Sequence, residues 1–184
     1  MVRVMGGVAR GRNLKSPAGL EFRPTTGRVK EFLFNVLQME VGDAVVLDLF
    51  SGTGSLGIEA ISRGAAHVTF VEQSPSSLKL LRENLSICQF ESQATVLSGD
   101  VFQQLESLGR QEKKFDLVLA DPPFKENYRA RIIKSIDENV LIGDQGRLIV
   151  EHEQHDPAHD GGRMAQYRQN KFGACTVSFY GVQS

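Results

Sequence analysis

The sequence predicts an α/β protein with a doubly wound sheet, and three observations favour this fold class. From residue 44 onward, short apolar runs alternate with helical patterns, as in parallel sheets covered by helices on both faces. A glycine-rich turn follows the first apolar run, at the point where a strand passes into a helix. With 184 residues, the chain is long enough for one well-buried domain and short of two average ones.

The expected elements alternate along most of the chain. Ser74 and Pro75 suit the N-cap and the first position of the second helix. The chain ends in two β-rich runs separated by Phe172 and Gly173, which predict a hairpin. The expected strands are 44–50, 67–72, 94–99, 115–120, 146–151, 164–171 and 174–180, and the expected helices are 54–63, 76–88, 102–108 and 128–140.

Residues 1–40 are expected to form an extension packed on a catalytic domain of residues 41–184. A small hairpin over residues 2–23 would use Gly6, Gly7 and Gly11 as turn residues. Thr25 or Thr26 would then cap a helix that runs to about Leu37. Its apolar face would consist of Phe32, Leu33, Val36 and Leu37.

Charge is unevenly distributed along the chain. The net charge is -1, yet residues 1–30 hold seven basic residues and one acidic residue, a net of +6 that leaves -7 for the rest. A basic arm on an acidic body is typical of nucleic-acid binding, because cations near phosphates release condensed counterions. A solvated charged hairpin is the alternative. The candidate RNA-binding residues are Arg3, Arg10, Arg12, Lys15, Arg23 and Arg28.

The glycine-rich turn carries the first candidate site. Gly52, Gly54 and Gly57 also match the dinucleotide fingerprint, in which backbone approaches a pyrophosphate. Asp48, at the end of the preceding strand, would repel a pyrophosphate and suits the cationic ammonium of a methionine moiety. The pattern resembles motif I of the S-adenosylmethionine methyltransferases. The cofactor-binding candidates here are Asp48, Phe50, Gly52, Thr53 and Gly54.

Two further acids follow the next strands. Glu72 lies 18 residues beyond Gly54, the distance at which an acid accepts hydrogen bonds from ribose hydroxyls. Asp100 occupies the position of the acid that contacts the adenine amino group in many methyltransferases, with Val101 beside it. Capping of the following helix is the alternative role for Asp100.

The run Asp121-Pro122-Pro123-Phe124 follows the apolar strand 115–120 and resembles motif IV of the amino-methyltransferases that act on base nitrogens. Prolines lack N–H donors, so their carbonyls are left to point into a site. Asp121 and one such carbonyl would accept the two N–H bonds of an exocyclic amine, and Phe124 would stack on the base. The catalytic candidates are Asp121, Pro122 and Phe124.

The whole chain resembles the bacterial 16S rRNA guanine-N2 methyltransferases, of the type that modifies guanine 966. The resemblance implies a seven-stranded sheet whose last strand is antiparallel, S-adenosylmethionine as cofactor, the N2 amine of guanine as acceptor, and 16S rRNA or the small subunit as partner. Gly27, Ser51 and Thr53 depart from the expected Asp, Ala and Ser. The matching residues are Arg3–Gly7, Gly11-Arg12, Leu20, Arg23–Thr26, Arg28–Glu31, Leu33–Asn35, Leu56-Gly57, Glu59-Ala60 and Ser62–Gly64.

Other functions remain open. The same motifs suit DNA adenine-N6 and protein-glutamine methyltransferases, a non-catalytic RNA-binding assembly factor could keep the fold, and the glycines alone permit a nicotinamide oxidoreductase. His152, His155, Asp156 and His159 form a candidate metal cluster in an expected loop, but no cysteine lies beside it, so no metal is expected. Neither a membrane span nor a signal peptide is expected, which favours a cytoplasmic protein with reduced Cys88 and Cys175.

Overall fold

The computed structural model describes residues 2–17, 24–123, 128–153 and 162–183. The helices are α1 (Pro24–Val36), α2 (Ser55–Ser62), α3 (Pro75–Cys88), α4 (Val101–Arg110) and α5 (Tyr128–Glu138), with a 3-10 turn at Glu91–Gln93. The strands are β1 (Val2–Arg3), β2 (Asn13–Leu14), β3 (Val45–Leu49), β4 (His67–Glu72), β5 (Ala94–Ser98), β6 (Phe115–Ala120), β7 (Ile142–Glu153), β8 (Met164–Phe172) and β9 (Cys175–Val182).

The main sheet has seven strands in the order β5-β4-β3-β6-β7-β9-β8. Strands β3 to β7 pair in parallel, whereas β9 inserts between β7 and β8 and runs antiparallel to both. The doubly wound sheet and its antiparallel last strand are therefore confirmed. Because β9 is reversed, the turn between β8 and β9 lies at the edge where the parallel strands end.

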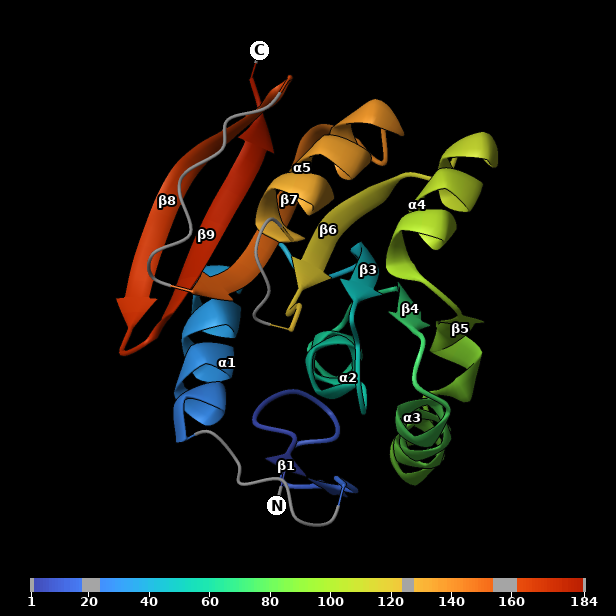
Figure 1. Ribbon diagram of the computed structural model, residues 1–184. Coiled ribbons are helices and arrows are strands. Elements are labelled where there is room, and N and C mark those ends of the chain that lie inside the picture. The colour runs from blue at the N-terminus through green and yellow to red at the C-terminus, as the bar shows by residue number, and fades with distance from the viewer. Residues whose placement is uncertain (1, 18–23, 124–127, 154–161, 184) are drawn as a thin grey trace.

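Helices cover both faces of the sheet (Figure 1). Side chains of α1, α2 and α3 share one hydrophobic core with the N-terminal hairpin, and those of α4 and α5 form a second core on the opposite face. Neighbouring β3 residues divide between the two, since Val46 belongs to the first core and Leu47 to the second. This alternation is the period-2 pattern of a strand buried on both faces.

Two local expectations were wrong. Helix α1 already includes Pro24, so Thr25 and Thr26 lie inside the helix and neither is its N-cap; proline suits this first position because its missing N–H has no partner in the first turn anyway. His152 lies within β7 and is buried, because β7 continues to Glu153, where it pairs with the start of β9. By contrast, Ser74 caps α3 ahead of Pro75 as expected.

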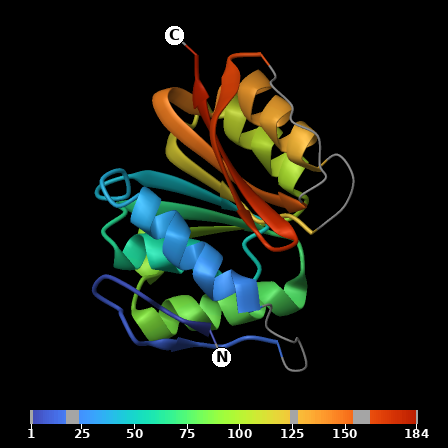
Figure 2. The ribbon, with the colours of Figure 1, turned by 90° about the vertical axis from the view of Figure 1, so that its left-hand side faces the viewer.

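The N-terminal hairpin docks on the C-terminal end of α2. The backbone N–H of Val8 donates to the carbonyl of Ser62 at 2.7 Å, and the N–H of Ala9 donates to Oγ of Ser62 at 2.9 Å. Gly7 has φ of 73°, and a Cβ there would lie 1.5 Å from the Ser62 carbonyl oxygen. Only glycine allows this approach. Figure 2 shows α1 lying between this hairpin and the β8–β9 hairpin.

A fully buried carboxylate, Glu59 of α2, joins the hairpin to α1. Its oxygens accept hydrogen bonds from the backbone N–H groups of Met5 and Gly6, both at 2.8 Å. Nζ of Lys30 lies 3.2 Å from one oxygen, and Nε of Arg63 lies 2.8 Å from the other. Burial lowers the pKa of Lys30, and Glu59 opposes that shift. Lys30, one of the seven basic residues of the arm, is therefore part of the core.

No helix within the described residues has the length and apolar character needed to cross a membrane.

We expect Glu59→Gln to lower the free energy of unfolding by about 3–5 kcal/mol, because it leaves the buried Lys30 charge without its counter-ion. Denaturant unfolding followed by circular dichroism measures the change. Glu83→Gln is the matched control, since it removes the more exposed pair with Lys15 and should hardly move the midpoint. Equal shifts in the two variants would show that the buried cluster does not hold the extension in place.

Candidate active site

The candidate site lies where β3 and β6 end side by side. Leu49 of β3 is paired with Ala120 of β6, so Phe50 and Asp121 are the next residues on the two strands. After β3 the chain continues to β4 on one side of this pair, and after β6 it continues to β7 on the other side. The space between the ends of β3 and β6 is therefore the topological switch point of the sheet. Open α/β sheets bind ligands in the crevice at this point.

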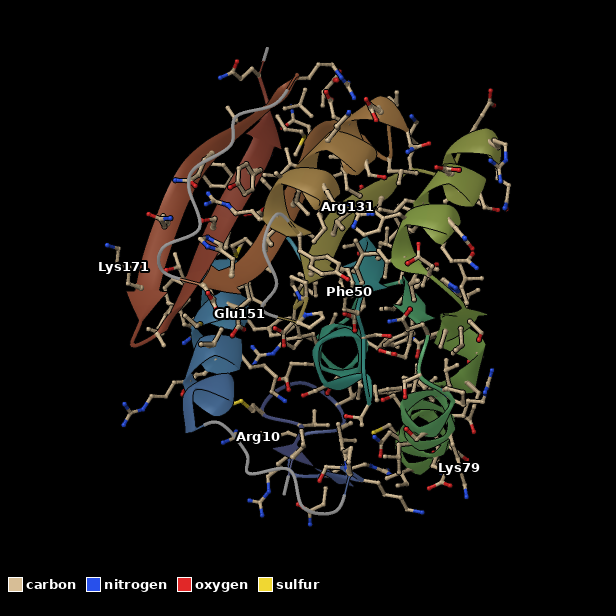
Figure 3. The ribbon with its side chains drawn as sticks, in the orientation of Figure 1. Arg10, Phe50, Lys79, Arg131, Glu151 and Lys171 are labelled. Carbon is tan, nitrogen blue, oxygen red and sulfur yellow. The ribbon has the colours of Figure 1, made fainter. Side chains whose placement is uncertain are left out.

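Two open cavities, of about 470 and 430 Å³, occupy the crevice, and Phe50 and Asp121 line both. The first lies over β4 and α4 and is also lined by Glu72, Gln73, Val101 and Pro123. The second lies beneath α1 and is also lined by Val29, Lys30, Asp48, Ser51, Ser55, Leu56 and Glu151. They are called the α4-side cavity and the α1-side cavity below. Figure 3 labels Phe50 and Glu151 at this edge of the sheet.

The glycine turn after β3 is held by two carboxylates. The backbone N–H of Gly57 donates to Oδ2 of Asp48 at 2.9 Å, and that of Gly52 donates to Oε2 of Glu72 at 2.7 Å. Gly54 has φ of 84°, and a Cβ there would lie 2.3 Å from Cδ1 of Leu81. The turn thus brings its backbone close to both acids.

Asp48 is the strongest electrostatic feature of the site. The side chain is buried, and desolvation raises the pKa of its carboxyl to about 8; repulsion from Asp121 and Glu72 adds to the rise, and the hydrogen bond from Gly57 opposes it. A carboxyl that is costly to ionise here becomes easier to ionise when a cation arrives. The Asp48 carboxyl therefore fits a positively charged group of a ligand.

The other cofactor-binding candidates occupy two neighbouring strand ends. Glu72 accepts the N–H groups of Gln73 and Ser74 at 2.9 and 2.7 Å, which fixes its carboxylate at the wall of the α4-side cavity. Asp100 caps α4 by accepting from the N–H groups of Phe102 and Gln103, and Val101 lines the same cavity. Thr53 accepts at its backbone carbonyl from the side chain of Asn84.

Sequence reasoning did not find an aromatic group beside the α4-side cavity. The ring of Phe50 makes edge contacts with those of Tyr128, at 5.4 Å between centroids, and Phe102, at 6.5 Å. The Arg131 guanidinium lies 3.8 Å from the Phe102 ring centroid. The three aromatic residues come from the loop after β3, from α4 and from α5, so their spacing in the sequence does not reveal that their rings meet. The wall of the cavity at Phe50 is therefore backed by aromatic rings.

The Asp121-Pro122-Pro123-Phe124 turn is described as far as Pro123. Pro122 is buried, whereas Asp121 and Pro123 are exposed; Phe124 lies outside the described residues. Beyond the turn, α5 begins with the buried Arg129, whose Nε donates to the Tyr180 hydroxyl at 2.6 Å. A buried arginine on an otherwise amphipathic helix gives no sequence signal until its partner on β9 is known.

The basic arm divides into two groups. Arg12 donates to the Ile87 carbonyl and Lys15 pairs with Glu83 at 2.8 Å, so both lie against α3. Arg12 and Lys15 are nevertheless exposed, as are Arg3, Arg10 and Arg28, whereas Arg23 lies outside the described residues.

The histidine segment is described only at His152. Its Nε2 lies 2.8 Å from Oγ of Ser178, and its Nδ1 lies 2.7 Å from the Glu153 carbonyl oxygen. Both ring nitrogens are therefore in contact with residues of the sheet. His155, Asp156 and His159 lie outside the described residues.

Comparison with known proteins gives the family. A family model described as "Conserved hypothetical protein 95" matches residues 2–181. The "Ribosomal RNA small subunit methyltransferase D" of Escherichia coli K12 is 36% identical over 83% of this chain and 75% of its own length. The protein of that name from Haemophilus influenzae is 37% identical over 85% of this chain and 81% of its own. The chain therefore belongs to the family described by this model.

A solved structure extends the likeness to the whole fold. The structure titled "Putative methyltransferase yhhF from Escherichia coli" has a TM-score of 0.87, with 32% identity over 99% of this chain and 98% of its own. The match includes the N-terminal hairpin as well as the sheet, so the extension is common to both proteins. The sheet whose strand ends form the crevice is likewise common to both.

Binding of S-adenosylhomocysteine at pH 7 should release about one proton, because its ammonium favours the ionised form of Asp48. Because the pKa of Asp48 is about 8 in the free protein, the affinity for S-adenosylhomocysteine should rise by up to about tenfold for each pH unit between pH 6 and 7.5. Titration calorimetry in two buffers of different ionisation enthalpy measures the proton. Asp48→Asn should abolish the release, and a binding heat of the wild type that is independent of buffer would contradict the role.

Proposed function

We propose that this protein transfers a methyl group from S-adenosylmethionine to the exocyclic N2 amine of a guanine in small-subunit ribosomal RNA. The observation that carries the proposal is the pair of cavities that share Phe50 and Asp121. The cavity beside α4 offers Glu72 to a nucleoside, and the cavity beneath α1 offers Asp48 and Glu151. Such a division suits a reaction between two ligands that meet at Asp121.

The cofactor would lie with its adenosine in the α4-side cavity. Glu72 is already oriented by three backbone donors and has acceptor capacity left for ribose hydroxyls. Val101 and Phe50 offer apolar contact to the adenine, and Asp100 faces the same end of the sheet from the cap of α4. Asp48 and the backbone at Gly52 and Gly54 would receive the methionine end.

S-adenosylmethionine supplies, when bound, an electrophilic methyl group whose thioether leaves without charge. The protein therefore has little acid catalysis to perform, and its main task is to align a weakly nucleophilic amine for in-line attack. Asp121 would accept an N–H bond of the amine and direct the lone pair towards the methyl carbon. One N–H proton leaves as the new N–C bond forms, and Asp121 would receive it.

The RNA would be held by the exposed part of the basic arm. Arg3, Arg10 and Arg28 have exposed side chains, and Arg23 belongs to the same arm. Arg12 and Lys15 are exposed as well, although both contact α3. The phosphates would meet these cations while the base enters the acidic crevice, in the cytoplasm where ribosomes are assembled. A small subunit or its free RNA would serve as partner.

The direct test is transfer of a tritiated methyl group to small subunits and naked RNA from a strain that lacks the enzyme. Nucleoside analysis of the product identifies the base and atom together. N2-methylguanosine at one position supports the proposal. N6-methyladenosine, or label found only in protein, would replace it with one of the other amino-methyltransferase activities.

Asp121→Ala should lower turnover on RNA by at least about a hundredfold, because the amine loses the group that orients it. Affinity for S-adenosylhomocysteine should stay within about twofold, since Asp121 is not among the expected cofactor contacts. Single-turnover kinetics and calorimetry measure the two effects, and Asp121→Asn should retain more activity because its amide keeps an acceptor oxygen. Near-full turnover in the alanine variant would remove Asp121 from the acceptor site.

Replacing Arg10 and Arg28 by alanine should weaken RNA binding and make it less dependent on salt. The slope of log K against log salt should fall by about 0.7–0.9 for each phosphate that the variant no longer neutralises. Filter binding measures this slope between about 50 and 200 mM salt, roughly the range in which phosphate contacts make the affinity depend on salt. Lys79→Ala, at an exposed site on α3, is the control. A double variant with the slope of the control would mean that these two residues do not contact RNA.

A further inference from the structure

A second carboxylate, Glu151, lies beside Asp121 on the neighbouring strand. Ala120 of β6 is paired with Val150 of β7, so Asp121 and Glu151 occupy the next positions along two parallel strands. Ala120 and Val150 both belong to the core beneath α4 and α5. Because side chains alternate along a strand, Glu151 is directed to the opposite face, where α1 lies. Asp121, just beyond the end of β6, lines the cavities on both sides. Glu151 accordingly lines the α1-side cavity together with Asp121.

Glu151 also borders an apolar recess that continues this cavity. The recess is small and is bounded by residues of α1, α2 and the central strands. Among the described residues, its lining consists of Val29, Leu33, Leu56, Leu119, Ala120, Ile149 and Val177, with Glu151 as the one charged member. Apolar walls with a few polar groups are typical of ligand pockets, in which the polar groups fix the orientation of the ligand.

Lys30 also lines the α1-side cavity, but its ammonium group is committed elsewhere. Nζ donates to the Arg3 carbonyl at 2.8 Å and to Oγ of Ser55 at 3.2 Å, and it pairs with Glu59. Among the described residues at the ends of β6 and β7, the charged groups that line this cavity are therefore the two acceptors Asp121 and Glu151. A base that presents two adjacent donors matches them.

We propose that Glu151 accepts the N1–H of the target base while Asp121 accepts from its 2-amino group, so that Glu151 selects guanine; this inference rests on the proposed function. Guanine presents N1–H and the 2-amino group side by side, whereas N1 of adenine is an unprotonated acceptor. An ionised carboxylate accepts hydrogen bonds and cannot donate one. Adenine in this position would leave a carboxylate facing a lone pair, and sites of this kind reject the wrong ligand strongly.

The test uses ribosomal RNA in which the methylated guanine is replaced by 2-aminopurine. This base keeps the 2-amino group, but its N1 is an acceptor. Wild-type enzyme should have a kcat/KM at least about a hundredfold lower on the 2-aminopurine RNA than on the guanine RNA. Glu151→Gln should reduce that ratio by about tenfold or more, because its amide can donate to N1. Glu153→Gln, at an exposed carboxylate two residues along β7, should leave the ratio unchanged.

The outcomes separate the inference from the proposed function. Wild-type enzyme that methylates both RNAs equally well overturns the selection of guanine through N1–H, whatever the folding of the variants. A Glu151→Gln ratio equal to that of wild type and Glu153→Gln overturns the role of Glu151, while methylation of the guanine RNA still supports the proposed function. If wild-type enzyme leaves guanine unmethylated in the subunit, the proposed function fails and the inference fails with it.

Discussion

The arrangement of this protein depends on the buried carboxylate of Glu59. A buried charge is tolerated only when paired and hydrogen-bonded, and Glu59 has two backbone N–H donors and two cations. The donors come from the hairpin, α1 and the end of α2, so one side chain ties three segments together. Because α2 starts at the glycine turn, the same cluster fixes the extension relative to the candidate cofactor site. Asn84 adds a second tie, since its side chain contacts Lys15 and Thr53.

The charges of the molecule are separated in a way that suits its two kinds of ligand. Asp48, Glu72, Asp121 and Glu151 surround the crevice, where they favour a cationic cofactor and a base that donates hydrogen bonds. The exposed arginines of the arm lie outside it, where a polyanion would meet them. An acidic interior would repel phosphates, so only a base turned out of the RNA would enter. The small net charge therefore conceals two regions of opposite sign.

Much of the fold could be predicted from the sequence because the strands are buried on both faces and appear as continuous apolar runs. The expected strand 115–120 coincides with β6, and Ser74 and Pro75 marked the start of α3. Local patterns did not reveal contacts between distant residues, such as Glu59 with Met5 or Arg129 with Tyr180. His152 was misplaced because β7 is prolonged by its pairing with β9, in which Ser178, 26 residues further along the chain, contacts the His152 ring. The candidate site residues were found by motif, whereas Glu151 required the strand register.

The proposed reaction requires the adenosine of the cofactor and the target base to lie on opposite sides of Phe50 and Asp121, with the methionine end of the cofactor reaching Asp48. A crystal structure of the protein with S-adenosylhomocysteine tests this division most directly. The adenosine should lie in the α4-side cavity with its ribose at Glu72, the ammonium group should approach Asp48, and the sulfur should face Asp121. Adenosine found beneath α1, between Val29 and Glu151, would contradict the division and the assignment of the acceptor site with it.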